Sequence, residues 1–241
     1  MLYDQSSSTL LATPDEVDLV TSAIEKPDET LANEESLQVL TKARAVVGDA
    51  VVPELVRLLN VVEEPLRIVS FEQISPIGGD LFTTSWNEAG DVGIMRSDED
   101  EEVAVTLTHF SILPSLLAQE LRLHQGADIG LRETEPEPQR LRASEIEKSV
   151  IGELDKALLP LDTAQYAWRV TGGFAETGID SSILFIHAGT NGLWRVDPEG
   201  AVGEEDPEVT LHPTNIEELL DLVGDVVTGR TVPVAEELER D

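Results

Sequence analysis

The sequence predicts an α+β fold that consists of two repeats related by a pseudo-twofold axis, with N-terminal helices before the first repeat. One observation is that helix-type and strand-type patterns follow one another in the same order twice along the chain. The other is that similar short sequences recur in that order, such as VTLTHFSILPSLL from Val105 and VTLHPTNIEELL from Val209. Each repeat is expected to contain a helix, a four-stranded antiparallel meander and a second helix.

The N-terminal part of the chain has the pattern of helices. Thr13 and Glu16 can form a capping box before a first helix, whose apolar side chains recur at helical spacing. A second helix is expected over residues 34–47 and should end at Gly48, because glycine readily takes the left-handed conformation that follows a helix. A third helix is expected around PELVRLLN, which begins at Pro53.

The next segment has the composition of strands. Short runs rich in β-branched and aromatic residues are separated by glycine-rich or acidic turns, which predicts an antiparallel meander. These runs are Leu66–Ile74, Leu81–Trp86, Val92–Arg96 and Val103–Thr108. Ser111 is expected to cap the helix that follows. The inward face of that helix would consist of Leu113, Leu116, Leu117 and Leu121.

The same sequence of elements is then expected again. RETEPEPQR, from Arg132, is predicted to be a linker because it has two prolines and almost no apolar residue. Ser144 and Glu147 can form a capping box, and Thr214 and Glu217 are expected to cap the last helix. The strands between them are predicted at Tyr166–Val170, Ser181–Ala188, Leu193–Val196 and Glu208–Leu211.

An internal duplication explains this order. GDVGIMRSD, from Gly90, is similar to GTNGLWRVD, from Gly189, at both glycines, the arginine and the final aspartate. The expected organisation is an N-terminal helical segment (1–48), a first α+β repeat (49–131), a linker (132–142), a second α+β repeat (143–229) and an acidic tail (230–241).

The net charge of −32 excludes several classes of partner. Nucleic-acid binding depends on Lys and Arg, and this chain has 16 of them against 48 acidic residues, so we expect no nucleic-acid partner. No apolar run is long enough to cross a membrane, so membrane insertion is not expected. Because the chain has no cysteine and no signal-peptide pattern, a cytoplasmic location is expected. The acidity itself fits either a device for solubility or adaptation to salt.

No motif of a catalytic or cofactor site stands out, so we expect no enzyme activity and no cofactor. The four histidines are His109, His124, His187 and His212. They are scattered, and His109 and His212 are interpreted as boundary residues that precede a helix. The pairs Gly78-Gly79 and Gly172-Gly173 are interpreted as turns between strands. The acidic run Ser97–Glu102 lacks the spaced ligands of a calcium loop, so no metal site is expected.

Three segments resemble the EspG family, the cytosolic chaperones of ESX (type VII) secretion systems. They read ELVRLLNVVEEPLRIVSF, VAVTLTHFSILPSLLAQEL and GLWRVDPEG followed by VTLHPTNIEELLDLV. The resemblance spans residues 51–229 and rests on order and pattern. It implies a quasi-twofold α+β fold and a non-enzymatic function, in which the chaperone binds the aggregation-prone tip of a PE–PPE heterodimer and delivers it for secretion.

The resemblance also implies where a client protein would bind. It points to the loop between the second and third strands of the first meander and to the C-terminal helix. The residues are Trp86, Asn87, Glu88, Ala89, Gly90, Val92, Ile216, Leu219 and Leu220. The loop is shorter than a client-gripping hairpin would require, so a plain hairpin turn is an equal interpretation, and Trp86 fits a core position as well.

Two other functions fit the same sequence. An acidic structural or regulatory protein would pair its open sheet edges with a second copy of the chain, as a homodimer without a client. An enzyme whose site the sequence does not reveal would show a deep pocket with convergent polar groups. The chaperone is the interpretation that the resemblance favours.

Overall fold

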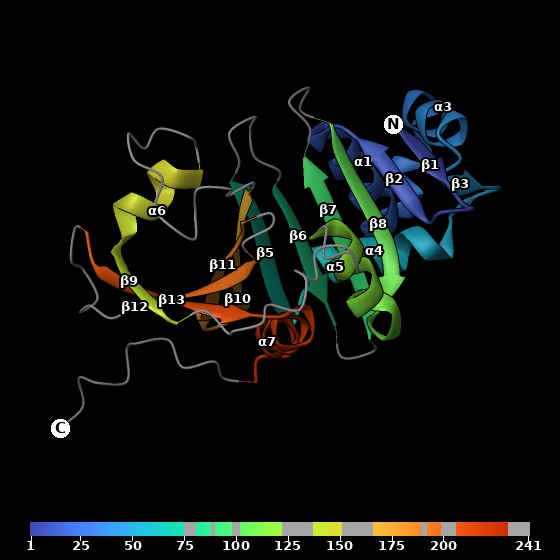
Figure 1. Ribbon diagram of the computed structural model, residues 1–241. Helices are drawn as coiled ribbons and strands as arrows, with labels where there is room; N and C mark the ends of the chain where they lie inside the picture. Colours follow the sequence, from blue (N-terminus) through green and yellow to red (C-terminus); the bar gives the residue numbers. More distant parts are fainter. Residues whose placement is uncertain are drawn as a thin grey trace. The chain divides into compact units, whose positions relative to one another are not determined.

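The computed structural model shows a mixed fold of helices and antiparallel sheet (Figure 1). It describes residues 1–74, 81–87, 90–97, 102–121, 137–150, 166–188, 192–198 and 206–230. The chain divides into two compact units. Unit 1 consists of Met1–Ile68 and Phe82–Leu113, and unit 2 consists of Val69–Leu81 and Pro114–Asp241.

The sheet of unit 1 has the strand order β1-β2-β8-β7-β6 and is antiparallel at every pairing described here. The strands are β1 (Leu2–Asp4), β2 (Thr9–Ala12), β6 (Leu81–Trp86), β7 (Asp91–Ser97) and β8 (Val103–His109). Strand β5 (Arg67–Ile74) begins in unit 1 and continues in unit 2. Strands β5 to β8 were predicted, because each contains a run of β-branched and aromatic residues that is long enough to recognise in the sequence. Strands β1 and β2 were not predicted.

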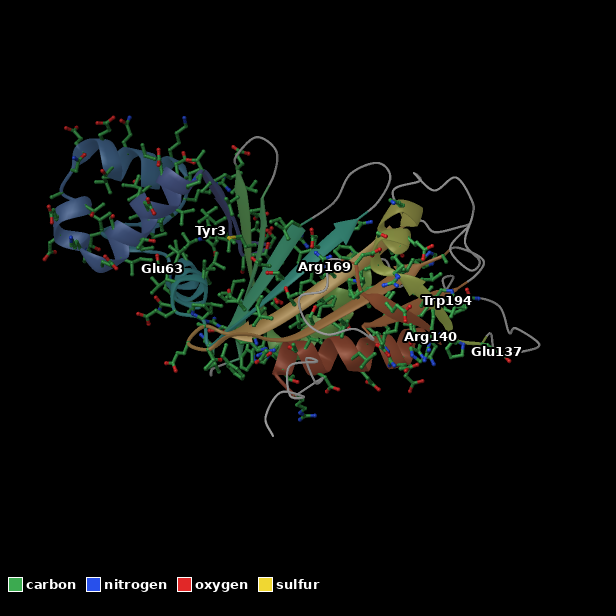
Figure 2. All side chains as sticks on the ribbon, turned by 90° about the vertical axis from the view of Figure 1, so that its left-hand side faces the viewer. Tyr3, Glu63, Glu137, Arg140, Arg169 and Trp194 are labelled. Atoms are coloured by element: carbon green, nitrogen blue, oxygen red, sulfur yellow. The ribbon has the colours of Figure 1, made fainter. Side chains whose placement is uncertain are left out.

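Four helices precede strand β5 in unit 1, and the first and last of them contact the strands of its sheet. They are α1 (Pro14–Glu25), α2 (Pro27–Thr30), α3 (Glu34–Lys42) and α4 (Pro53–Glu63). Helix α4 packs against β7 and β8 and buries Leu55, Leu58 and Leu59 completely or nearly so. Tyr3 lies in the same core, between the helices and the strands (Figure 2), and is 1% exposed.

Two predictions for the N-terminal segment were wrong. The segment expected to be helical begins with the β1–β2 hairpin, whose turn is held by Asp4, which accepts hydrogen bonds from Ser6 and Ser7. Strands of three and four residues are too short to show a period in the sequence. Helix α3 ends at Lys42, because Arg44 takes a left-handed conformation (φ 62°) and Val46 enters a short hairpin of β3 (Val46–Val47) and β4 (Ala50–Val51).

The sheet of unit 2 has the order β5-β10-β11-β12-β13-β9. The further strands are β9 (Gln139–Arg142), β10 (Tyr166–Phe174), β11 (Gly178–His187), β12 (Leu193–Pro198) and β13 (Glu208–Thr214). Helix α7 (Ile216–Thr228) packs against β10 and β11. Helix α6 (Ala143–Val150) contributes Ile146 to a second cluster around Trp194, which is 1% exposed (Figure 2).

Two features of unit 2 differ from the prediction. The last residues of the expected linker form β9, which pairs with β13 from Gln139 to Arg142. Gly172 and Gly173 do not form a turn between strands but lie inside β10, where the pairing with β11 shifts register. A side chain on Gly173 would come within 2.1 Å of the Gly178 carbonyl oxygen, so glycine is required for this close approach of two backbones.

The helix that follows β8 starts differently from the prediction. Its first turn is a 3₁₀ helix (Phe110–Ile112), which continues as α5 (Leu113–Glu120). His109, rather than Ser111, accepts the first hydrogen bond, from the Ser111 N–H at 3.2 Å. Its interpretation as a boundary residue is therefore confirmed. On the predicted inward face, Leu113, Leu117 and Leu121 are buried.

The last helix is also capped by a neighbour of the predicted residue. Asn215, rather than Thr214, accepts a hydrogen bond from the Glu218 N–H at 2.9 Å. The capping box predicted for the first helix involves the expected residues, because Glu16 accepts a hydrogen bond from the Thr13 N–H at 3.0 Å. No helix within the described ranges is both long enough and apolar enough to cross a membrane.

Candidate partner-binding site

The turn between β6 and β7 is closed by the side chain and backbone of Asn87. The Asn87 Oδ1 accepts from the Asp91 N–H at 3.1 Å, and the Asn87 N–H donates to the Asp91 carbonyl at 3.2 Å. Gly90 has φ of 82°, which a side chain would oppose, and its N–H donates to the Asn87 carbonyl. The described residues therefore have the geometry of a tight, braced hairpin turn. Glu88 and Ala89 lie outside the described residues.

A salt bridge ties this turn to helix α4. The Arg57 guanidinium donates to both carboxylate oxygens of Asp91, with Nε 3.2 Å from Oδ2. The Asp91 side chain is only 11% exposed, whereas Arg57 is 56% exposed. The hydrogen bonds to Asp91 raise the pKa of Arg57, so the guanidinium stays charged. This bidentate contact fixes the base of the turn against α4.

The turn also contacts the end of strand β8. The Phe110 N–H donates to the Gly90 carbonyl at 2.9 Å. The His109 ring lies so close to Gly90 that a side chain at this glycine would approach Nε2 to 3.1 Å. The other ring nitrogen, Nδ1, is 2.9 Å from the Ser111 hydroxyl. The turn and the start of the 3₁₀ helix therefore form one connected structure.

Four apolar residues that are at least partly exposed lie in the segments that meet at this turn. The rings of Trp86 and Phe110 are 5.7 Å apart and tilted by 56°, and both side chains are only partly buried. Leu66 donates its N–H to the Trp86 carbonyl at 2.9 Å and is 37% exposed. Ile112, in the 3₁₀ turn, is 51% exposed. We call the four residues Leu66, Trp86, Phe110 and Ile112 the Trp86 surface.

The other expected binding residues fall in different environments. Val92 and Leu219 are fully buried and belong to the packing of the fold, so they are not available to a partner in this structure. Ile216 and Leu220 are partly buried on α7, in unit 2. The Trp86 surface belongs to unit 1, so the expected residues divide between the two units.

The described polar cluster of unit 2 has a structural role. Arg195 donates to both oxygens of Asp197, at 2.9 and 2.8 Å, and to Glu218 at 3.3 Å. His212 approaches Asp197 to 3.5 Å. The contact with Asp197 raises the pKa of Arg195, which remains charged and links β12 to the first turn of α7. Among the residues that the structure describes, no group of three or more His, Asp or Glu side chains could hold a metal ion.

The sequence did not identify several members of this site. Phe110 lies two residues after the predicted strand, which ended at Thr108, and Arg57 is the one basic residue of the predicted helix PELVRLLN, so both carried a weak signal. The contact of His109 with Gly90 carried none, because it depends on how β7 and β8 pair. No protein-family model matches this chain, and no curated protein matches its sequence. The function of the site therefore has to be argued from its own residues.

Proposed function

We propose that this protein is a non-enzymatic binding protein that holds a protein partner on the Trp86 surface. The observation that carries the proposal is the partly exposed Trp86–Phe110 pair, with Ile112 51% exposed beside it in sequence. Aromatic side chains on rigid elements dominate the energetics of many protein interfaces. The turn that follows Trp86 is braced by Asn87 and by the Arg57–Asp91 salt bridge, so the surface would lose little conformational entropy on binding.

The partner that we propose is the client of a secretion chaperone. The resemblance to the EspG family suggests a helical PE–PPE-like heterodimer of a type VII (ESX) system, bound in the cytoplasm. Such a client exposes an apolar tip, which an apolar surface on a strongly charged protein could cover and keep soluble. The net charge of −32 supports the role of keeping the complex soluble.

The proposal includes the internal duplication. In both halves, four consecutive strands are followed by a helical segment whose start is capped by a side chain at the end of the last strand, from the final residue of β8 in the first half and from the residue after β13 in the second. His109 accepts from the Ser111 N–H, and Asn215 accepts from the Glu218 N–H. These correspondences support a common origin of the two halves.

The decisive experiment is a comparative pull-down from the cytosol of the native host. The baits are the wild-type protein, the variant Trp86→Ala with Ile112→Ser, and the control Leu11→Ser. Leu11 is a suitable control because it is 40% exposed in unit 1 but lies on β2, away from the turn. Bound proteins are identified and quantified by mass spectrometry, and circular dichroism verifies that each bait is folded.

We expect a partner in stoichiometric amount with the wild type and the control, and at least about tenfold less with the double variant. Equal recovery on all three baits would contradict the Trp86 surface as the binding site. Recovery of the bait alone, in more than one copy per particle, would replace the client by a second copy of the chain. If the recovered partner is not a helical secretion substrate, the result would support a binding function for this protein but contradict its role as a secretion chaperone.

A further inference from the structure

We infer that the partner segment bound by the Trp86 surface carries basic side chains as well as apolar ones. This inference rests on the proposed function and specifies the chemistry of the partner. It follows from the charges in unit 1, where the Trp86 surface lies. Neither the resemblance nor the apolar character of the four residues assigns a charge to the partner.

Cations near the surface are already engaged within the protein. The basic side chains in the described part of unit 1 are Lys26, Lys42, Arg44, Arg57, Arg67 and Arg96. Arg57 is held by both oxygens of Asp91, and Arg67 is fully buried. Arg96 lies over the Phe82 ring, 5.7 Å from its centroid. The other three precede α4 in the sequence, between the end of α1 and the start of β3. An acidic partner would therefore find no cation prepared for it beside Trp86.

Carboxylates, in contrast, lie close in sequence to one member of the surface, Leu66, although Glu63 also accepts a hydrogen bond from the Thr21 hydroxyl at 2.5 Å. Glu63 and Glu64 end helix α4 just before Leu66, and both are exposed. Farther away, the excess of 48 acidic over 16 basic residues gives the whole chain a strongly negative potential. Such a potential speeds the approach of a basic partner and slows that of an acidic one.

The aromatic pair adds a short-range preference of the same sign. The face of a tryptophan or phenylalanine ring attracts the ammonium of Lys and the guanidinium of Arg. Trp86 and Phe110 are tilted by 56° relative to each other, so they present ring faces in two directions. The matching partner segment has an apolar side chain that packs against Leu66 and Ile112. Lys or Arg residues on either side of it would then contact the aromatic rings and the carboxylates.

Two synthetic amphipathic helical peptides test this inference. Both carry Leu and Trp at the same positions on the apolar face, and the polar positions are all Lys in one peptide and all Glu in the other. Binding of each fluorescently labelled peptide is measured by anisotropy at about 0.1 M and about 0.5 M salt. The proteins are the wild type, the single variants Trp86→Ala and Ile112→Ser, and Leu11→Ser. Ile112 is exposed, so its variant tests the surface even if the loss of Trp86 disturbs the fold.

We expect the Lys peptide to bind the wild type and Leu11→Ser equally, and to bind Trp86→Ala and Ile112→Ser at least about tenfold more weakly. Higher salt should weaken the binding, and the Glu peptide should not bind. Equal binding of the Lys peptide to every variant would overturn the inference, because attraction to the whole acidic surface would then explain it. Failure of the Lys peptide to bind the wild type would overturn it too. Equal binding of both peptides would remove the charge preference but leave the apolar surface, and the proposed function, standing.

Discussion

His187 shows how one buried side chain can make stability depend on pH. Its ring stacks on Tyr166 across the β10–β11 pair, with centroids 4.9 Å apart, and the side chain is only 8% exposed. Burial disfavours the charged imidazolium and lowers the pKa of His187 below its ordinary value of 6.5. In the unfolded chain the imidazole titrates near that ordinary value.

Acidification should therefore destabilise the protein through His187. Between pH 6.5 and the lower pKa of the folded state, the unfolded chain binds a proton that the native protein does not. The contribution of His187 to the free energy of unfolding is thus complete above pH 6.5 and is lost as the pH falls towards the native pKa. Urea denaturation near pH 7 and near pH 5 would measure the loss. His187→Phe keeps an aromatic ring on Tyr166 but cannot titrate, so its loss should be smaller, and an identical loss would exclude His187 as the cause.

Residue-level predictions from the sequence were accurate to within one or two positions. Thr214 and Glu217 were predicted to cap the last helix, and the pair that does so is Asn215 and Glu218. Thr214 instead donates its hydroxyl to Glu218 at 2.9 Å. Adjacent Thr and Asn are both good capping residues, and the choice between them depends on where β13 ends, which pairing with β12 determines.

At the level of elements, the sequence located strands better than it located their register. The runs from Tyr166 and Glu208 are strands as predicted. The repeated VTL motifs, however, pair differently, since Val105 faces Met95 whereas Val209 faces Pro198. The segment between the repeated arginine and VTL is longer in the second half, so the motif is displaced along its strand. Loop length fixes the register of a hairpin, and short motifs do not reveal it.

Glycine positions give an element-level prediction with a matched control. Gly173→Ala should destabilise unit 2 by about 1–3 kcal/mol, because the new Cβ would lie 2.1 Å from the Gly178 carbonyl oxygen. Gly224→Ala, inside α7, meets nothing within 4 Å and should stabilise the protein by about 0.5–1 kcal/mol. Urea titration followed by circular dichroism measures both. Equal effects of the two substitutions would show that the β10–β11 pair is looser than the structure indicates.

At the level of the whole molecule, charge and hydrophobic burial act against each other. A net charge of −32 on 241 residues repels itself in the compact state. Each unit is held together by its own apolar residues, such as Leu10 and Leu55 in unit 1 and Trp194 in unit 2. The composition predicted such a core. The assignment of Val69–Leu81, part of the first predicted repeat, to unit 2 could not be predicted, since it depends on which strands share contacts.

Salt should therefore raise the thermal stability. Between about 0.1 M and about 1 M sodium chloride the screening length falls from about 10 Å to about 3 Å, which removes most of the repulsion between surface carboxylates. We expect Tm, measured by calorimetry, to rise by several degrees over that range. Chloride is preferred to sulfate because sulfate also strengthens hydrophobic burial. A constant or falling Tm would show that the acidic groups are too far apart to oppose folding.

The early end of helix α3 has a consequence for the edge of the sheet in unit 1. Because the helix stops at Lys42, the carbonyl of Ala43 is free to accept the N–H of Tyr3, at 2.8 Å. Tyr3 is the central residue of β1, and this N–H points away from β2. The outward donor of the edge strand is thus occupied from within the chain. Another extended chain therefore cannot pair with β1 at this position. The hydrogen of the Tyr3 amide should exchange with solvent more slowly than is usual for an outward-facing amide of an edge strand.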